Sequence, residues 1–377
     1  MKKAIIILSS AFFTASAVMA GVLVAEGKPI EYVVAVDHRF PTSQGMDLKK
    51  ITEGIGELIG DTKHQRRIRI SKSELGKLNL PIGVLFEELK VFRNPMPKGF
   101  GCAKEPEVPA PTPDPNPGTQ VTDWGVLRVR GDIAQKTEDA SSVLVCVLDT
   151  GIDMSHSDLR YLNGKNFTSA ASGDFQDRNG HGTHTAGLVA AVNNKFGVIG
   201  ASQARIIAGK VLDDGGSGYN SWISEGIYWC ADSGAQIISM SLGGPEPSSV
   251  ILSALTYATA RGIDVFAAAG NDSSPDVGYP AGHVMPRLYS VSATDQEDRL
   301  AWFSNWGKVD FTCPGVDILS TYIYNDYERL SGTSMATPLC AGIAAIFRAR
   351  GKDYVAQPMG SPEKFGRGML IGTDALR

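Results

Sequence analysis

The sequence predicts an α/β fold, in which a doubly wound and mostly parallel sheet carries helices on both faces. Residues 143–148 (VLVCVL) form an almost unbroken apolar run, which is typical of a parallel strand covered on both sides. Similar strands are expected within 196–211, 236–242 and 263–269, and helices over 181–192, 221–233 and 248–261. This alternation of strands and helices indicates a parallel sheet, and the 42 glycines suit its tight loops.

Length and net charge favour a large globular protein and give no support to a nucleic-acid-binding one. At 377 residues the chain is long enough to bury a large core, and its formal net charge of −4 gives no sign of a nucleic-acid partner.

The first 20 residues predict a secretory signal peptide. Lys2 and Lys3 form a basic start, an apolar run begins at Ile5, and small residues near Ala20 provide a cleavage context. An uncleaved membrane anchor is the alternative, but the apolar run is short and interrupted by serines. We therefore expect an exported protein, extracellular or periplasmic, with no membrane attachment after cleavage.

A small α+β unit is expected over residues 21–101. Residues 31–36, 67–70 and 83–92 predict strands, and apolar spacing over 46–59 predicts a helix. Residues 102–118 then form a linker, because proline recurs almost every second position from 104 onward and prevents a helix or a sheet ladder. The third region, 119–377, contains the alternating strands and helices.

Three polar side chains in this third region stand at the ends of expected elements. Asp149 directly follows the strand at 143–148, His181 opens a helix after a Gly-rich turn, and Ser334 lies at a turn that enters a helix. Functional groups in such sheets gather at the carboxyl ends of the strands. A carboxylate, an imidazole and a hydroxyl together are the groups that nucleophilic acyl transfer requires.

The motifs around these residues resemble the signatures of subtilisin-like serine proteases (subtilases, peptidase family S8). They are Asp149-Thr150-Gly151, HGTH at 181–184 and GTSMATP at 332–338, in that family's order of acid, histidine and serine. The resemblance covers about 119–377. It implies a secreted serine endopeptidase that hydrolyses peptide bonds of polypeptide substrates through an acyl-enzyme intermediate. It also implies a zymogen, in which residues 21–101 act as a propeptide that assists folding and inhibits the enzyme.

Further residues match the family's active-site segments. By resemblance, Asn271 and the backbone N–H of Ser334 would form the oxyanion hole, and the Tyr279-Pro280 turn would flank the first specificity pocket. The substrate would add as an extended strand between two edges of the groove. The residues expected to bind it are Gly216, Ser217, Gly218, Ser241, Leu242, Gly243, Ala268 and Gly270.

A calcium site is also implied by the resemblance. Residues 192–198 (VNNKFGV) resemble the family's calcium loop, although Asn-Asn before Gly could by itself be an ordinary turn. All-oxygen coordination suits Ca²⁺ in preference to a transition metal. The expected ligands are Gln120, Asp158, Val192, Asn194, Phe196 and Val198.

The five cysteines permit disulfides, but their pairing cannot be read from the sequence. Cys146 and Cys230 lie in regions that are bridged in some relatives, so a bond between them is a hypothesis. Cys313 and Cys340 stand where the family commonly has alanine and valine, and we expect both to be small buried side chains. His156 and His184 are expected to be structural neighbours of the site.

Two other functions are compatible with the fold. A catalytically silent peptide-binding scaffold would lack part of the acid–histidine–serine set, and that set is complete here. A selective processing protease for dibasic sites would need acidic side chains in the pocket, and none is evident.

We expect a monomer whose linker is cut near Gly118, so that the mature enzyme begins close to Thr119.

Overall fold

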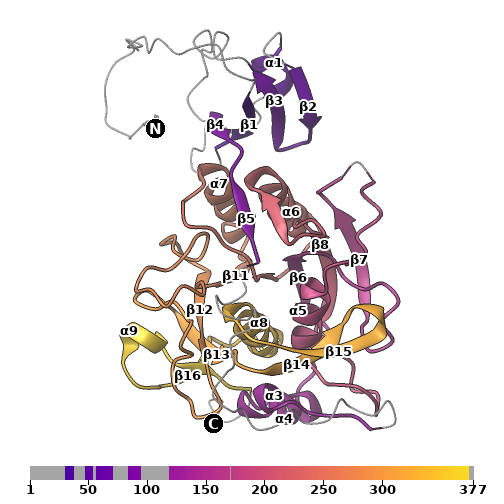
Figure 1. The fold of residues 1–377 in the computed structure, drawn as a ribbon, viewed down its shortest axis with the longest axis vertical. Helices are drawn as coiled ribbons and strands as arrows, with labels where there is room; N and C mark the ends of the chain where they lie inside the picture. The colour runs from indigo at the N-terminus through magenta and orange to yellow at the C-terminus, as the bar shows by residue number, and fades with distance from the viewer. Residues whose placement is uncertain are drawn as a thin grey trace.

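The computed structural model describes residues 30–37, 47–53, 57–70, 84–94, 119–169 and 171–372. Within them, a small antiparallel sheet near the N-terminus stands over one end of a larger α/β body (Figure 1). The predicted fold class is confirmed, and the expected signal peptide and linker lie outside the described residues.

The small sheet has four antiparallel strands in the order β2-β3-β1-β4. Its elements are β1 (Ile30–Val36), α1 (Leu48–Ile51), β2 (Glu57–Asp61), β3 (Gln65–Ile70) and β4 (Val84–Glu88). The prediction of one helix over 46–59 is wrong at its C-terminal end, because Leu58 and its neighbours pair with β3. Gly54 and Gly56 interrupt the segment in the sequence and disfavour a longer helix.

The larger sheet contains nine strands in the order β16-β17-β13-β12-β11-β10-β6-β8-β7. All neighbours are parallel except β16 and β17. The strands are β6 (Leu144–Asp149), β7 (Tyr161–Asn166), β8 (Arg205–Lys210), β10 (Ile237–Met240), β11 (Asp264–Ala268), β12 (Leu288–Thr294), β13 (Phe311–Pro314), β16 (Ala356–Gln357) and β17 (Met369–Leu370). After β6 the chain forms the edge strand β7, then β8 between β7 and β6, and then crosses to β10 on the other side of β6. Groups at the carboxyl ends of β6 and β10 therefore flank the point where a ligand crevice forms in such sheets.

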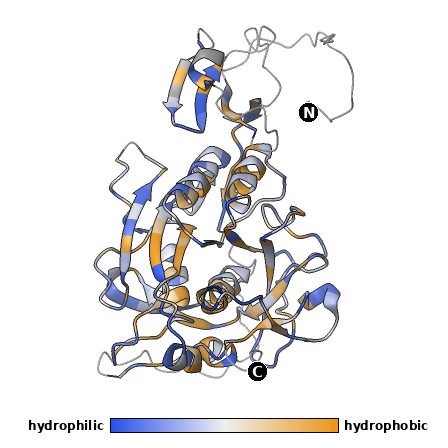
Figure 2. Ribbon diagram, turned by 180° about the vertical axis from the view of Figure 1, so that it is seen from behind, coloured by the Kyte–Doolittle hydropathy of each residue, from blue (hydrophilic) through white to orange (hydrophobic). Residues whose placement is uncertain are grey.

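Helices cover both faces of this sheet, as predicted. Helices α5 (His181–Ala190) and α8 (Thr333–Ala349) pack on one face, against Val145 and Val147 of β6. Helices α6 (Asn220–Asp232) and α7 (Ser249–Thr259) pack on the other, against Cys146 and Leu148. The strands between them are largely hydrophobic (Figure 2), as strands with two buried faces must be.

Short elements complete the body. They are α3 (Trp124–Arg128), α4 (Gly131–Thr137), the hairpin of β14 (Ile318–Tyr322) and β15 (Asp326–Leu330) with η2 (Ile323–Asn325) between them, and α9 (Pro362–Phe365). Among the described residues, no helix has the length and apolar character needed to span a membrane.

The small sheet rests on α6 and α7 (Figure 1). The Gln65 side chain donates to Ser221 O at 2.6 Å, and the His64 ring stacks on Tyr228 with 4.0 Å between ring centroids. At the N-terminus of α7, Glu87 Oε2 accepts from the backbone N–H of Val250 at 3.0 Å. A carboxylate there satisfies a helix N–H that lacks an intrahelical partner, so the two units are joined through specific polar contacts.

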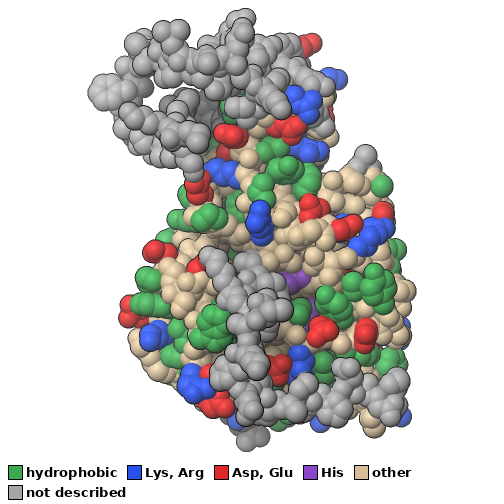
Figure 3. All heavy atoms as spheres, in the orientation of Figure 1, with side chains coloured by type: hydrophobic (Ala, Val, Ile, Leu, Met, Phe, Trp, Pro, Cys, Tyr) green, Lys and Arg blue, Asp and Glu red, His purple; other side chains and the backbone are tan. Residues whose placement is uncertain are grey.

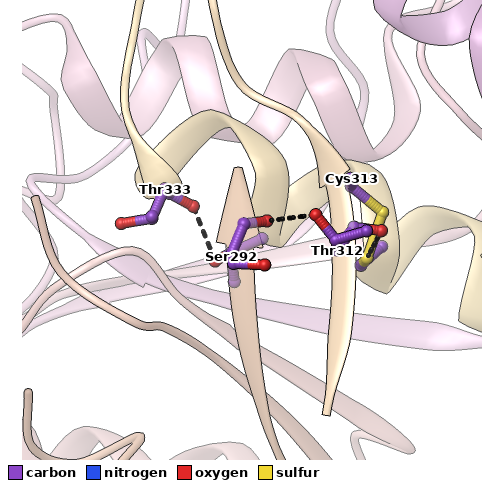
Figure 4. Close-up of a disulfide and its surroundings, with 6 residues drawn as sticks. Ser292, Thr312, Cys313 and Thr333 are labelled. Carbon is purple, nitrogen blue, oxygen red and sulfur yellow. Dashed lines mark hydrogen bonds between the residues drawn. A yellow bond between two sulfur atoms is a disulfide. The ribbon is translucent and has the colours of Figure 1, made fainter. Parts of the chain in front are cut away.

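Two disulfides cross-link the larger unit. Cys146–Cys230 joins β6 to α6, which confirms the hypothesised pair. Cys313–Cys340 joins β13 to α8 (Figure 4), so these two residues, whose pairing the sequence left open, form a disulfide as well as being the small buried side chains expected. Both are buried, and their Cα atoms lie 6.0 Å apart, within the range for a disulfide. This proximity arises from tertiary packing and leaves no local signal. The fifth cysteine, Cys102, lies outside the described residues.

Candidate active site

Asp149 and His181 form a buried hydrogen-bonded pair. Asp149 is the last residue of β6, and His181 is the first residue of α5. His181 Nδ1 lies 2.7 Å from Asp149 Oδ1, and both side chains are almost inaccessible to solvent. His181 Nε2 has no hydrogen-bond partner among the described residues. The carboxylate thus occupies one ring nitrogen and leaves the other available.

Burial and charge act in opposite directions on the imidazole. Burial alone would lower the pKa of His181, but the Asp149 carboxylate, through its charge and its hydrogen bond, raises that pKa above the ordinary value. The charge of Asp177 acts in the same direction. An imidazole with a raised pKa is a stronger proton acceptor once it is neutral.

Asp177 holds the start of α5, a role that the sequence analysis missed. Its carboxylate accepts from the backbone N–H groups of Gly180 at 3.0 Å and Thr183 at 2.9 Å, and from Thr150 Oγ1 at 2.9 Å. It therefore ties the turn that presents His181 to the residue after Asp149. An acidic residue shortly before a helix start is a capping signal that could have been used to find it.

Ser334 lies in the first turn of α8, beside the end of β10. Its Oγ donates to Ser241 O at 3.4 Å, and Ser241 Oγ donates back to Ser334 O at 2.7 Å. Because β10 pairs in parallel with β6, with Met240 opposite Leu148, Ser241 and Asp149 leave the sheet at the same edge. No hydrogen bond links Ser334 Oγ to His181 Nε2 within the described chain. Such bonds commonly tighten only when substrate binds.

Asn271 follows β11 at this same edge, and its side-chain oxygen is fixed. Asn271 Oδ1 accepts from both the backbone N–H and the Oγ1 of Thr333, each at 2.9 Å. Its Nδ2 lies 3.4 Å from the point where a Cβ on Gly332 would be placed. The carboxamide is thus held against the turn that carries Ser334. Thr333 was not predicted as a functional residue, although it adjoins the predicted serine.

The expected substrate groove is occupied by the chain's own strand. Residues of β5 (Val91–Arg93) pair antiparallel with β9 (Ser217–Tyr219), opposite Ser217 and Gly218. On the other side, Arg93 exchanges two backbone hydrogen bonds with Gly243, at 3.0 and 2.8 Å. Asn94 N–H donates to Gly216 O at 3.1 Å. The two predicted edges therefore face each other across an extended segment.

Phe92 anchors this segment. Its side chain is 2% exposed and belongs to the same buried cluster as Leu212 and Leu242. A Cβ on Gly244 would lie 3.0 Å from the Phe92 ring, so the glycine gives the ring room. The predicted residue Leu242 is thus part of an apolar pocket that is filled.

Comparison with known proteins agrees with this geometry. The profile of the subtilase family (Peptidase_S8) matches residues 140–364, which include Asp149, His181, Asn271 and Ser334. Subtilisin Savinase of Lederbergia lenta is 39% identical over 272 residues, 68% of this chain and 100% of that protein. The chain belongs to the subtilase family.

Other similar proteins carry related descriptions. A thermostable alkaline protease of Halalkalibacterium halodurans is 40% identical over 266 residues, 67% of this chain and 73% of that protein. Subtilisin amylosacchariticus of Bacillus subtilis subsp. amylosacchariticus is 44% identical over 238 residues, 61% of this chain and 62% of that protein. The protein is therefore a subtilisin-like serine endopeptidase that acts on polypeptide substrates.

The remaining predicted residues of this subtilase lie around Asn271. Ala268 ends β11, and Gly270 N–H donates to Thr333 Oγ1 at 3.2 Å. The Tyr279–Pro280 peptide bond, in the turn expected beside the first specificity pocket, is cis.

Oxygen atoms of the predicted calcium loop converge on the side chain of Gln120. Gln120 Nε2 lies 2.9 Å from Val192 O, 3.1 Å from Phe196 O, and 3.4 Å from both Asn194 Oδ1 and Val198 O. An amide nitrogen carries only two protons, so four acceptors around one point exceed what it can satisfy. A cation suits such an oxygen-rich point, and rotating the amide would add Gln120 Oε1 to the set. The residues present therefore fit a calcium ion.

Asp158 adjoins this loop. Its carboxylate accepts from Asn194 Nδ2 and from the backbone N–H of Val198, each at 2.8 Å. Burial raises the pKa of Asp158, and hydrogen bonds from Val198 and Asn194 oppose this rise only in part. The six predicted ligand residues are thus neighbours in space.

The two histidines expected to be structural have backbone partners. His184 Nε2 contacts Ile318 O and Glu328 O, each at 3.0 Å, and burial lowers the pKa of His184 to about 3. His156 Nε2 lies 2.9 Å from Asp326 O. His184 lies in α5 and His156 in the loop after β6, and each ring contacts a backbone carbonyl of the β14–β15 hairpin.

Proposed function

We propose that Ser334 is the nucleophile of this endopeptidase, with His181 as its general base and Asp149 as the group that orients His181. The observation that carries this proposal is the 2.7 Å Asp149–His181 contact, which leaves Nε2 available at the sheet edge where Ser334 lies. The carboxylate keeps the proton on Nδ1 and stabilises the imidazolium once Nε2 is protonated.

The reaction proceeds in two halves. Ser334 Oγ attacks the carbonyl carbon of the peptide bond while its proton passes to His181 Nε2. The negative oxygen of the tetrahedral intermediate is held by Ser334 N–H and Asn271 Nδ2. Collapse of the intermediate breaks the C–N bond, and His181 gives its proton to the departing amine. Water then attacks the acyl-enzyme by the same route and regenerates Ser334.

Substitution tests these roles. Ser334→Ala and His181→Ala should each reduce hydrolysis of a peptide substrate by several orders of magnitude. Ser331→Ala is a matched control, because this nearby buried serine accepts a hydrogen bond from Asp317 N–H at 2.9 Å and has no part in the mechanism. Retained activity in Ser334→Ala would contradict the assignment.

We infer that residues 21–101 form a propeptide that assists folding and inhibits the enzyme. The seat of β5 between β9 and Gly243 supports this, because it places a strand of the chain where a substrate strand would bind. Release would follow cleavage near Gly118, with the mature enzyme beginning close to Thr119. N-terminal sequencing of the active enzyme tests the boundary, and a start upstream of Lys104 would contradict it.

We propose that Ca²⁺ stabilises the enzyme at the loop of residues 192–198. Gln120, Asp158, Asn194 and the carbonyl groups of Val192, Phe196 and Val198 would hold it. When bound, the ion would offset the mutual repulsion of these oxygens. It would also join the segment around Gln120, at the start of the larger unit, to the loop after α5. The residues themselves keep the loop closed through the contacts of Gln120 and Asp158.

We further propose that the protein is exported, to the medium or the periplasm, and works there as a monomer without membrane attachment. The basic and apolar start of the sequence and its small-residue cleavage context support export. On the described part of the face in Figure 3, acidic and basic side chains are interspersed. A nucleic-acid partner would favour a continuous basic patch instead, so we propose that the enzyme has none. Comparing the enzyme's N-terminus and location in cell fractions tests this proposal.

A further inference from the structure

The segment that carries Asn271 has no regular secondary structure. It leaves β11 after Ala268 and continues through residue 276 as irregular chain with bends. An oxyanion donor must be held in place before the reaction, because reorganisation during the reaction would cost part of its benefit. The position of this segment therefore depends on contacts from elsewhere in the chain.

Asn305 supplies four of these contacts from a single side chain. Its Oδ1 accepts from the backbone N–H groups of Asp272 at 2.8 Å and Ser274 at 3.2 Å. Its Nδ2 donates to the carbonyl oxygens of Ala269 at 3.3 Å and Asp276 at 3.0 Å. A carboxamide has two protons and two accepting lone pairs, so every site on this side chain is used.

These bonds reach the backbone on both sides of Asn271. Before it, Ala269 O is bound by the side chain, and Gly270 O accepts from Asn305 N–H at 2.9 Å. After it, Asp272 N–H is bound at 2.8 Å. The fit is tight, because a Cβ on Gly270 would lie 2.4 Å from Asn305 Nδ2, and Gly270 has φ of +111°. A glycine is therefore needed where the clamp closes.

Asn305 is itself fixed to the sheet. It is 3% exposed, and its own carbonyl accepts from Ser304 Oγ at 3.0 Å. Ser304 Oγ in turn accepts from the backbone N–H of Ala293, in β12, at 3.0 Å. The clamp thus connects the Asn271 segment to a buried strand and not to another irregular segment.

We infer that Asn305 is a positioning residue for catalysis, which acts by holding the Asn271 amide at the oxyanion. This inference rests on the proposed role of Asn271. Thr333 fixes the side-chain oxygen of Asn271, whereas Asn305 fixes the backbone from which that side chain projects. A displacement of about 1 Å in such a group can cost on the order of 10²-fold in rate.

Two substitutions test the clamp. Asn305→Asp keeps the size and the accepting oxygen but removes both N–H donors, and Asn305→Ser is a second variant that avoids burying a charge. With an amide substrate, each should lower kcat about 10- to 100-fold and change KM less than about 3-fold. A folded variant with unchanged kcat, or one whose loss lies entirely in KM, would overturn the inference.

Asn166→Asp is the matched control. Asn166 is also a buried asparagine that clamps a loop, because it donates to Asp174 O at 2.7 Å and accepts from Thr168 N–H at 2.8 Å. It lies on β7, the edge strand of the sheet, and its side-chain hydrogen bonds within the described chain are to Asp174 and Thr168, neither of which is a predicted site residue. It should lower Tm while leaving kcat within about 2-fold of the parent, which separates loss of stability from loss of positioning.

A double-mutant cycle with Asn271→Ala decides whether Asn305 acts through Asn271. In the parent, Asn305→Asp should cost about 10- to 100-fold in kcat, but in the Asn271→Ala background it should cost less than about 3-fold. Equal losses in both backgrounds would overturn the inference while leaving the oxyanion role of Asn271 intact. An Asn271→Ala variant with unchanged kcat would instead contradict the proposed oxyanion role, and the inference with it.

Discussion

Removal of the Cys313–Cys340 disulfide should destabilise the protein markedly. The bond joins residues 27 positions apart, and both side chains are completely buried. A loop of this length corresponds to about 3.5 kcal/mol of unfolded-state entropy at 25 °C. For a domain of this size, that loss in the free energy of unfolding corresponds to a fall in Tm of about 7–14 °C.

The test is a double substitution, Cys313→Ala with Cys340→Val, in a Ser334→Ala background. The parent residues are replaced by small apolar side chains that suit a buried site, and loss of the nucleophile prevents autolysis during heating. Thermal unfolding followed by circular dichroism gives Tm for the variant and its parent. The bond ends at Cys340 in α8, the helix that also carries Ser334 (Figure 4).

The second disulfide provides the comparison. Cys146–Cys230 joins residues 84 positions apart, so its removal should cost slightly more, about 4.6 kcal/mol. If the Cys313–Cys340 variant unfolds within about 2 °C of its parent, or if mass analysis finds free thiols at both positions in the folded protein, the reasoning is refuted.

Three further predictions concern the site. Asp149 raises the pKa of His181, and activity needs the neutral imidazole, so kcat/KM should fall on the acid side at a midpoint above about pH 6.5. Asp149→Asn should move this midpoint to lower pH and reduce kcat about 10⁴-fold. An unchanged midpoint would contradict Asp149 as the cause of the raised pKa. Excess EDTA should shorten the half-life of the enzyme at elevated temperature, and Asp158→Asn should reduce that sensitivity; equal half-lives with and without EDTA would argue against the ion. Phe92→Ala should weaken inhibition by the propeptide about 10²-fold, measured as the activity of the uncleaved chain. Val91→Ala should change this inhibition little, because the Val91 side chain is 49% exposed. Similar effects of the two substitutions would rule out Phe92 as the anchor.

Much of the site could be predicted because its residues stand in short local motifs at element ends. Asp149 follows an apolar strand, His181 opens a helix, and Ser334 enters another, and each of these features is visible within a few residues of sequence. Parallel strands bring their carboxyl ends to one edge, so the alternation of strands and helices predicts that these residues meet, whereas the order of the strands is known only from the structure.

Contacts between distant segments could not be predicted in the same way. The Cys313–Cys340 bond and the Asn305 clamp depend on the packing of β13, α8 and the segment after β11, and neither leaves a periodic or compositional signal. The expected helix over 46–59 is wrong at its C-terminal end for a similar reason. Its apolar spacing is compatible with a helix, but pairing of Leu58 with Ile68 across the small sheet decides the structure.

The central claim, that Ser334 is the nucleophile, is tested most directly by active-site labelling. The purified, processed enzyme is treated with a fluorophosphonate, which reacts with an activated serine, and the modified peptide is identified by mass spectrometry. We predict a single modification on Ser334, absent from His181→Ala, in which the hydroxyl is no longer activated. Labelling of a different serine, or complete inactivation without modification of Ser334, would contradict the account.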